Sequence, residues 1–255
     1  MPKPRNVLKS ADKVFNIAEH LMAGGGKTVT ELSNELDIPK STAQVYLNTL
    51  YKHDFVTKAD GKYVIGLGFL RYGIHALWNV AIYPEARAKV DELAESTGEL
   101  AACFVEEDGD AVYIYGVEGD NAVRTDLSVG DRSALHCTAS GKAILAHLPE
   151  ERVDEVIDAG LIRKTPNTIT DPATLRDELA HTRERGYAFS DEESVEGMRA
   201  VAAPIVLNGR VKGSISLAGP ANRFVGERYK QTIPELVTGA ANELELRLTY
   251  SQSGL

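Results

Sequence analysis

Residues 28–65 read TVTELSNELDIPKSTAQVYLNTLYKHDFVTKADGKYVI, and this stretch decides the fold of the first part of the chain. Thr28 and Glu31 have the spacing of a capping box, in which each side chain hydrogen-bonds the other residue's backbone, so a helix is predicted to begin here. A short turn follows. Because proline is favoured in the first turn of a helix, a further helix is predicted from Pro39 to about His53.

The end of this stretch is a predicted β-hairpin. Asp60-Gly61 stands between two runs of β-forming residues, which is a strong hairpin signal. Upstream, residues 7–23 place apolar side chains at steps of three and four, as in an amphipathic helix, and the glycines at 24–26 end it. Helix, helix, turn, helix and hairpin in this order predict a winged helix-turn-helix over residues 1–66.

The polar side of the predicted helix 39–53 is the first candidate site. The major groove of DNA accepts a helix, whose first residues reach base edges and phosphates, and a glutamine such as Gln44 can pair with adenine through two hydrogen bonds. A solvated polar face on a protein-binding winged helix is the alternative. The residues predicted to contact DNA are Thr28, Lys40, Ser41, Thr42, Gln44, Val45, Asn48, Lys58 and Lys62.

The charge of the chain is unevenly distributed. The formal net charge is −9, yet residues 1–80 contain ten Lys or Arg and seven Asp or Glu, a net of +3, which leaves −12 for the remainder. An acidic body on a mildly basic module is typical of a DNA-binding protein whose body stays away from the phosphates. The excess of acid is also typical of a halophile's solvated surface, in which case DNA would be bound at high salt with weaker attraction to phosphate.

The second part of the chain predicts an α+β domain. Residues 67–82 form a strongly apolar helical pattern, predicted to be a linker helix that packs against the first helix or a partner subunit. Residues 83–255 alternate strand and helix patterns, which favours a mixed or mostly antiparallel sheet. Helices are predicted at 84–97, 138–148, 150–159, 171–185 and 224–248, and strands at 100–106, 111–117, 122–127, 187–191, 200–207 and 211–218.

Composition bears on the location of the protein. No apolar run approaches the roughly 20 residues that cross a bilayer, and the basic start MPKPRNVLKSADK has no apolar segment behind it. We therefore expect no membrane partner, no signal peptide and a cytoplasmic location. Cys103 and Cys137 lie in apolar settings and are interpreted as reduced core residues, with a disulfide or a metal site as the alternative.

Residues 7–248 resemble the IclR family of bacterial and archaeal regulators, with motifs of two domains in family order. In the N-terminal part these are Thr30-Glu31-Leu32, Pro39-Lys40-Ser41-Thr42, Leu47-x-x-Leu50 and Tyr63-x-x-Gly66. In the C-terminal part they are Leu135-His136-x-Thr138-Ala139-Ser140-Gly141-Lys142-Ala143, Gly186-Tyr187-Ala188, Glu192-Glu193, Gly197-x-Arg199, Ala202-Ala203-Pro204 and Ser216-x-x-Gly219-Pro220.

The resemblance implies a transcription regulator. Its expected parts are a winged helix-turn-helix and a GAF-like effector domain. The protein is expected to bind a pseudo-palindromic operator as a dimer, and often as a dimer of dimers. Such a protein represses or activates a catabolic or metabolic operon in response to a small metabolite. The chain departs from the family pattern at Val45, where Arg is frequent, and at Asp54, where Gly is frequent.

The resemblance also implies an effector site. Family members that bind small carboxylates use an acidic residue, a cysteine, two serines and backbone N–H groups. The matching positions here are Leu135, His136, Thr138, Ala139, Ser190 (or Asp191 if the register shifts by one), Ala200, Ser216 and Ala218. Only Ser216 is clearly retained, and a buried unpaired polar ligand atom costs roughly 1–3 kcal/mol. We therefore expect a larger or less polar ligand than glyoxylate or pyruvate, such as a sugar acid or an aromatic catabolite.

Other chemistry finds little support in the sequence. Gly141-Lys142 lacks the remaining residues of a Walker motif, so Thr138 is interpreted as a helix cap. No metal-ligand set, nucleophile–base pair or cofactor motif stands out, so catalytic residues, metal and cofactor are all predicted to be absent. Glu192-Glu193 and Glu106-Glu107-Asp108 are interpreted as exposed charge. The alternatives to a regulator are an enzyme that processes a small molecule and a protein-binding adaptor.

Overall fold

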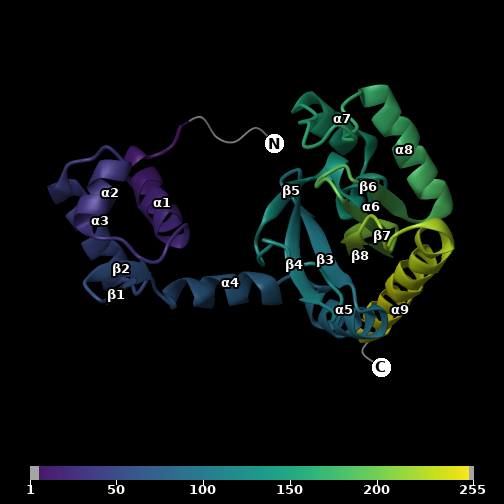
Figure 1. Ribbon diagram of the computed structural model, residues 1–255, viewed down its shortest axis with the longest axis horizontal. Helices are drawn as coiled ribbons and strands as arrows, with labels where there is room; N and C mark the ends of the chain where they lie inside the picture. Colours follow the sequence, from purple (N-terminus) through teal and green to yellow (C-terminus); the bar gives the residue numbers. More distant parts are fainter. Residues whose placement is uncertain (1–5, 253–255) are drawn as a thin grey trace. The chain divides into compact units, whose positions relative to one another are not determined.

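The computed structural model describes residues 6–252 and divides the chain into two compact units, one ending at Asn79 and the other beginning at Val80. Figure 1 shows both units with their elements labelled. Lys3 and Arg5 of the basic start, and the last three residues of the predicted domain 83–255, lie outside the described residues. Within residues 6–252, no helix combines the length and the apolarity that crossing a membrane requires.

The N-terminal unit is a winged helix-turn-helix, as predicted. Thr28 and Glu31 form both hydrogen bonds of the capping box at the start of its second helix. Asp60 and Gly61 have φ of 50° and 77°, the paired positive values that a tight type I′ hairpin turn requires. The elements are α1 (Lys9–Met22), α2 (Val29–Glu35), α3 (Lys40–Lys52), β1 (Val56–Ala59), β2 (Lys62–Ile65) and α4 (Gly68–Trp78).

The junction between α3 and the wing explains one departure from the family pattern. Asp54 has a φ of 63°, in the left-handed region that glycine adopts most readily and that Asp and Asn tolerate better than other residues. Its carbonyl accepts the backbone N–H of Gly68. A side chain at Gly66 or Gly68 would clash with that carbonyl, because a Cβ there would lie 2.5 or 2.4 Å from the oxygen. The chain therefore keeps the turn with aspartate in place of the frequent glycine.

The first half of helix α4 packs on its own unit. The ring of Phe69 lies 4.4 Å from that of Phe55, centroid to centroid. All 11 residues of α4 are described and none is buried, and the exposed fractions of Leu67 and Leu70, at its start, are 85% and 55%. Packing against the first helix, one of the two predicted possibilities, therefore does not bury the apolar side chains of this segment.

The C-terminal unit is built on one six-stranded antiparallel sheet in the order β5-β4-β3-β8-β7-β6. Every strand pair in the described residues is antiparallel, so the mixed alternative does not apply. The strands are β3 (Leu100–Glu107), β4 (Asp110–Glu118), β5 (Arg132–Ala134), β6 (Ala188–Asp191), β7 (Met198–Leu207) and β8 (Arg210–Pro220).

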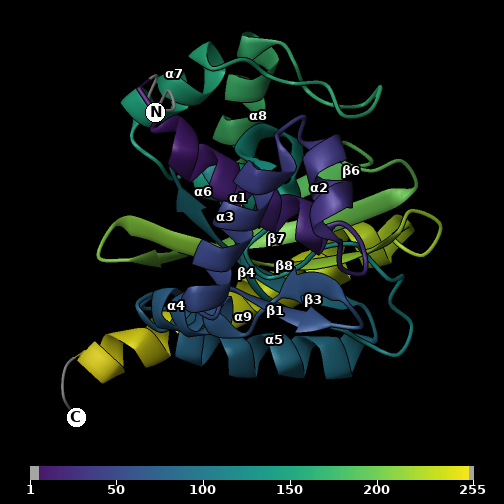
Figure 2. The ribbon, with the colours of Figure 1, turned by 90° about the vertical axis from the view of Figure 1, so that its left-hand side faces the viewer.

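Helices cover both faces of this sheet. Figures 1 and 2 show α5 (Tyr83–Thr97) and α9 (Ile233–Gln252) on one side, and α6 (Ala139–Leu145), α7 (Glu150–Asp158) and α8 (Pro172–Arg185) on the other. The apolar core between the sheet and α6–α8 includes Phe104, Tyr113 and Leu135. A 3₁₀ turn, η1 (Leu135–Cys137), leads into α6, and a π-helical turn, η2 (Arg228–Thr232), leads into α9, so the last α-helix begins later than predicted.

One predicted strand is wrong. Residues 122–127 are described and form no strand, and the edge of the sheet is occupied by β5 at 132–134 instead. The backbone N–H of Thr125 donates to the carboxylate of Glu118 rather than to a neighbouring strand. The alternation of apolar and polar residues in this segment matches a strand, but a strand also needs a partner for its backbone groups.

Candidate functional site

Helix α3 has one buried side and one exposed side. Ala43, Leu47 and Leu50 pack into the core of the winged unit and are at most 3% exposed. On the other side of the helix, Lys40, Ser41, Val45 and Asn48 are exposed, and 62% of the Val45 surface is accessible. The predicted DNA-contacting residues of α3 are thus brought together along one exposed edge, with Thr42 and Gln44 half-buried at its margin.

The remaining predicted DNA-contacting residues lie at the start of α2 and on the wing, which is the hairpin of β1 and β2. Lys58 and Lys62 are exposed on β1 and β2. Thr28 is engaged in the capping box, since the Glu31 carboxylate accepts from its backbone N–H at 2.6 Å and from its hydroxyl at 2.9 Å. These hydrogen bonds, the backbone one first, lower the pKa of Glu31. The structure therefore gives the Thr28 hydroxyl a helix-capping contact.

Gln44 is not a free side chain. Its Nε2 donates to Asn48 Oδ1 at 2.8 Å and to the Tyr63 hydroxyl at 3.0 Å. The sequence indicated Gln44 as a base-reading residue but gave no sign of the contact with Tyr63 on the wing.

The strand residues predicted for the effector site lie side by side. Ser190 pairs with Ala200, which pairs with Ala218, across β6, β7 and β8. Ser216 pairs with Ala202, two residues from Ala200 and therefore on the same face of the sheet. Ala139 of α6 packs on this face, in an apolar cluster with Ala143, Ala188, Ala200 and Ala202. The predicted positions from the strands and from α6 thus share one face.

The other predicted effector residues have contacts of their own. Leu135 is fully buried in the core, and Thr138 caps α6 by accepting the backbone N–H of Gly141. Asp191 is exposed and pairs with Arg199 at 2.6 Å. His136 is 2% exposed, and its Nε2 lies 3.0 Å from the carbonyl oxygen of Ile162.

His136 makes the stability of this unit depend on pH. Burial lowers the pKa of its imidazole, and the nearby charges of Lys142 and Lys164 act in the same direction, against the opposing effect of the hydrogen bond to Ile162. A base whose pKa is lowered by folding binds protons better in the unfolded chain. The stability it contributes is therefore present above the ordinary histidine pKa of about 6.5 and is lost as the pH falls below it.

We therefore expect His136→Gln, which keeps a donor for the Ile162 carbonyl, to flatten the loss of thermal stability between about pH 7.5 and about pH 5.5. Thermal unfolding of both proteins across this range is the measurement. His181→Gln, at an exposed position on α8, is the matched control and should keep the wild-type slope. Parallel curves for His136→Gln and wild type would contradict the assignment.

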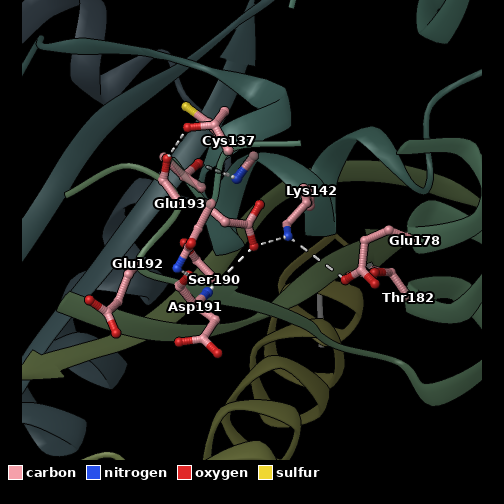
Figure 3. Close-up of polar contacts among 12 residues, drawn as sticks. Cys137, Lys142, Glu178, Thr182, Ser190, Asp191, Glu192 and Glu193 are labelled. Carbon is pink, nitrogen blue, oxygen red and sulfur yellow. Dashed lines mark hydrogen bonds and ion pairs between the residues drawn. The ribbon is translucent and has the colours of Figure 1, made fainter. Parts of the chain in front are cut away.

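A buried ion pair links α6 to the end of β6. Lys142 is 1% exposed, and its Nζ lies 2.5 Å from Oε1 of Glu193, itself 6% exposed. Glu178 of α8 lies 3.8 Å from the same ammonium. Figure 3 shows Lys142 between these two carboxylates. The other oxygen of Glu193, Oε2, is buried with no hydrogen-bond partner among the described residues, and burial raises the pKa of this carboxyl.

The segment that carries Glu193 is held by the loop after α7. The hydroxyl of Thr168 donates to the Glu193 carbonyl at 2.6 Å, and the hydroxyl of Thr165 donates to the Glu192 carbonyl at 2.7 Å. The interpretation of Glu193 as exposed charge was wrong. All seven residues of α6 are buried, Lys142 among them, and a buried lysine needs a carboxylate partner.

The described residues contain no cluster of three or more His, Cys, Asp or Glu with the geometry of a metal site. Cys103 and Cys137 are buried and free, so they form no disulfide. Burial raises the pKa of the Cys103 thiol to about 12, which keeps it protonated.

A helix with an exposed polar edge beside a wing, followed by a separate α+β domain, is the arrangement of a DNA-binding transcription regulator with a second, sensing domain. The domain matches agree with this class. Residues 10–60 match the IclR helix-turn-helix domain, and residues 74–246 match the domain described as bacterial transcriptional regulator IclR C-terminal. The chain belongs to the IclR family of transcriptional regulators.

Individual relatives extend over nearly the whole chain. The Halobacterium salinarum protein named "Probable HTH-type transcriptional regulator ArcR" is 35% identical over 253 residues, covering 95% of this chain and 93% of that protein. The crystal structure of Thermotoga maritima IclR matches with a TM-score of 0.82 and 31% identity, covering 94% of this chain and 98% of that one. An IclR homolog from Microbacterium hydrocarbonoxydans, solved with 4-hydroxybenzoate, matches with a TM-score of 0.78 and 22% identity, covering 94% and 99% of the two chains. The family and its relatives are regulators, which excludes the enzyme alternative.

Proposed function

We propose that this regulator acts in the cytoplasm as a homodimer or a dimer of dimers, and that it reads a pseudo-palindromic operator with the exposed edge of α3. The observation that carries this proposal is the division of α3 into a buried apolar side and an exposed edge with Lys40, Ser41, Val45 and Asn48. The free N–H groups at the start of such a helix attract a phosphate, and the side chains beyond them reach base edges.

Apolar exposure supports the dimer. Leu67 directly before α4, Leu70 and Ile74 of α4, and Phe15 of α1 are between 44% and 85% exposed. Exposed large apolar side chains that gather on one module are typical of an interface between subunits. In a dimer with twofold symmetry, two α3 helices meet half-sites about 34–36 Å apart, one turn of the duplex.

The effector is proposed to bind on the sheet face that carries Ser190, Ala200 and Ala218, under the segment 128–138. Alanine at two of these positions offers apolar contact where a thiol or a hydroxyl would donate a hydrogen bond. We therefore propose an effector larger or less polar than glyoxylate, either a sugar acid or an aromatic acid, and the 4-hydroxybenzoate bound to the Microbacterium homolog is an example of the second kind.

The test measures the binding of DNA and of candidate effectors to the same protein. Full-length protein is titrated onto a fluorescent duplex of its own promoter region, with and without 4-hydroxybenzoate, a hexuronic acid, glyoxylate or pyruvate. By linkage, an effector changes DNA affinity by the factor by which DNA changes effector affinity, typically about 5- to 150-fold. Tight glyoxylate binding that is lost in Ser216→Ala would contradict the effector proposal, and failure to bind duplex DNA at any salt concentration would contradict the DNA-binding proposal.

Val45 gives a separate prediction, because a valine here replaces a frequent arginine of the family. Val45→Arg adds a cation at an exposed position of the proposed DNA-contacting edge. We expect about tenfold tighter DNA binding at moderate salt and an increase of about 1 in the salt slope. Val225→Arg, at an exposed position of the C-terminal unit, is the control for the added charge. Equal effects of the two substitutions would contradict the placement of Val45 on DNA.

A further inference from the structure

We infer that Tyr63 of the wing is a positioning residue for base reading by α3, and that it fixes the Gln44 amide so that only one of its two polar ends faces the DNA. The inference deepens the proposed function, on which it rests. It concerns which hydrogen-bonding groups the exposed edge of α3 presents to a base pair.

The Gln44 amide is held from two directions. Its Nε2 lies 2.8 Å from Asn48 Oδ1, one helical turn further along α3, and 3.0 Å from the Tyr63 hydroxyl on β2. A primary amide nitrogen has two hydrogens, and these two acceptors take both. The two-hydrogen-bond pairing of glutamine with adenine needs the donor and the acceptor of the amide at once. Held in this way, Gln44 cannot form that pairing.

What remains available for a base is chiefly the amide oxygen of Gln44 and the amide nitrogen of Asn48, a helical turn apart. Gln44 keeps its Oε1, and Asn48, whose Oδ1 is occupied by Gln44, keeps its Nδ2 hydrogens. In the major groove, an acceptor fits the amino group of adenine or cytosine, and a donor fits N7 of a purine or O6 of guanine. The pair of amides therefore reads two neighbouring positions with single hydrogen bonds of opposite direction.

Tyr63 is suited to hold this arrangement because it is itself fixed. The residue is 4% exposed. Its backbone N–H and carbonyl both pair with Lys27, at 2.8 and 2.9 Å, and the Lys58 ammonium lies 4.9 Å from the centre of its ring. Replacing Tyr63 by phenylalanine removes only the hydroxyl and keeps the backbone pairing and the ring beneath Lys58. The substitution thus isolates the contact with Gln44.

The test is selection of preferred duplexes from a pool of randomised double-stranded oligonucleotides by the full-length protein. The proteins compared are wild type, Tyr63→Phe, Gln44→Ala, the double variant and the control Tyr51→Phe, which removes a phenolic hydroxyl from an exposed residue at the other end of α3. We expect Tyr63→Phe to change base preference at least about fivefold, at the base pair that Gln44→Ala also affects. The double variant should match Gln44→Ala, and Tyr51→Phe should match wild type.

Asn48→Ala provides a second route, because it removes the other anchor of the same amide at an exposed position and leaves the wing intact. It should alter the base pair that Tyr63→Phe alters and, in addition, the neighbouring base pair that Asn48 itself reads. If Gln44→Ala changes the preference while Tyr63→Phe and Asn48→Ala leave that base pair as in wild type, the positioning role of Tyr63 is overturned and the proposed function stands. If Gln44→Ala leaves base preference unchanged while Ser41→Glu still abolishes binding, Gln44 reads no base. The inference about Tyr63 is then overturned, and the proposed function is not. If no α3 variant affects binding, the proposed function falls with it.

Discussion

Replacement of Lys142 by methionine is expected to lower the free energy of unfolding of the C-terminal unit by about 3–5 kcal/mol, because it leaves the buried Glu193 carboxylate without its cation. Lys142 is 1% exposed and Glu193 is 6% exposed, so water cannot replace the lost contact. Urea denaturation followed by circular dichroism measures the change. The exposed Lys212→Met is the matched control and should be close to wild type.

Two further measurements identify the cause of that loss. Glu193→Gln added to Lys142→Met removes the uncompensated charge and should restore much of the stability. Burial already raises the pKa of Glu193, so lowering the pH protonates this carboxyl before carboxyls with ordinary pKa values. The loss of unfolding free energy in Lys142→Met should therefore shrink as the pH falls. A destabilised single variant whose defect neither the second substitution nor acid reduces would contradict the ion-pair explanation.

Ser41→Glu is expected to weaken DNA binding at least about 100-fold, because it places a carboxylate at the start of α3, where a phosphate or base edge is proposed to lie. Folding should be preserved, since a negative charge in the first turn of a helix is favourable. Anisotropy titration on a promoter duplex, together with a thermal melt, measures both effects. Gln231→Glu changes the net charge equally at an exposed position of the C-terminal unit and should bind like wild type. Equal binding by Ser41→Glu and Gln231→Glu would remove α3 from the interface.

Local signals made the N-terminal unit predictable. The capping box, the proline that opens α3 and the Asp-Gly turn each act within four residues, and each favours one local backbone conformation. The same local reasoning was wrong for residues 122–127. Their alternation suits a strand, but whether a neighbouring strand lies within reach depends on how the whole sheet is arranged.

The polar side chains at the sites were harder to predict because their partners are distant in sequence. Lys142 and Glu193 are 51 residues apart, and Gln44 and Tyr63 are 19 apart. A lysine within an apolar helix signals that some carboxylate must be buried with it, but the sequence contains many acidic residues and does not select one. The Gln44–Asn48 contact has the spacing of neighbours on a helix surface, whereas the hydroxyl of Tyr63 reaches Gln44 only through the folded wing.

The most direct test of the central claim, that the exposed edge of α3 lies in the major groove of a duplex, is protection of guanine N7 from methylation on a promoter fragment. N7 lies in the major groove, so a helix seated there shields it. We expect two protected patches about one helical turn apart for wild type and neither patch for Ser41→Glu. Binding without any protection of guanine N7, or protection that Ser41→Glu leaves unchanged, would contradict the account.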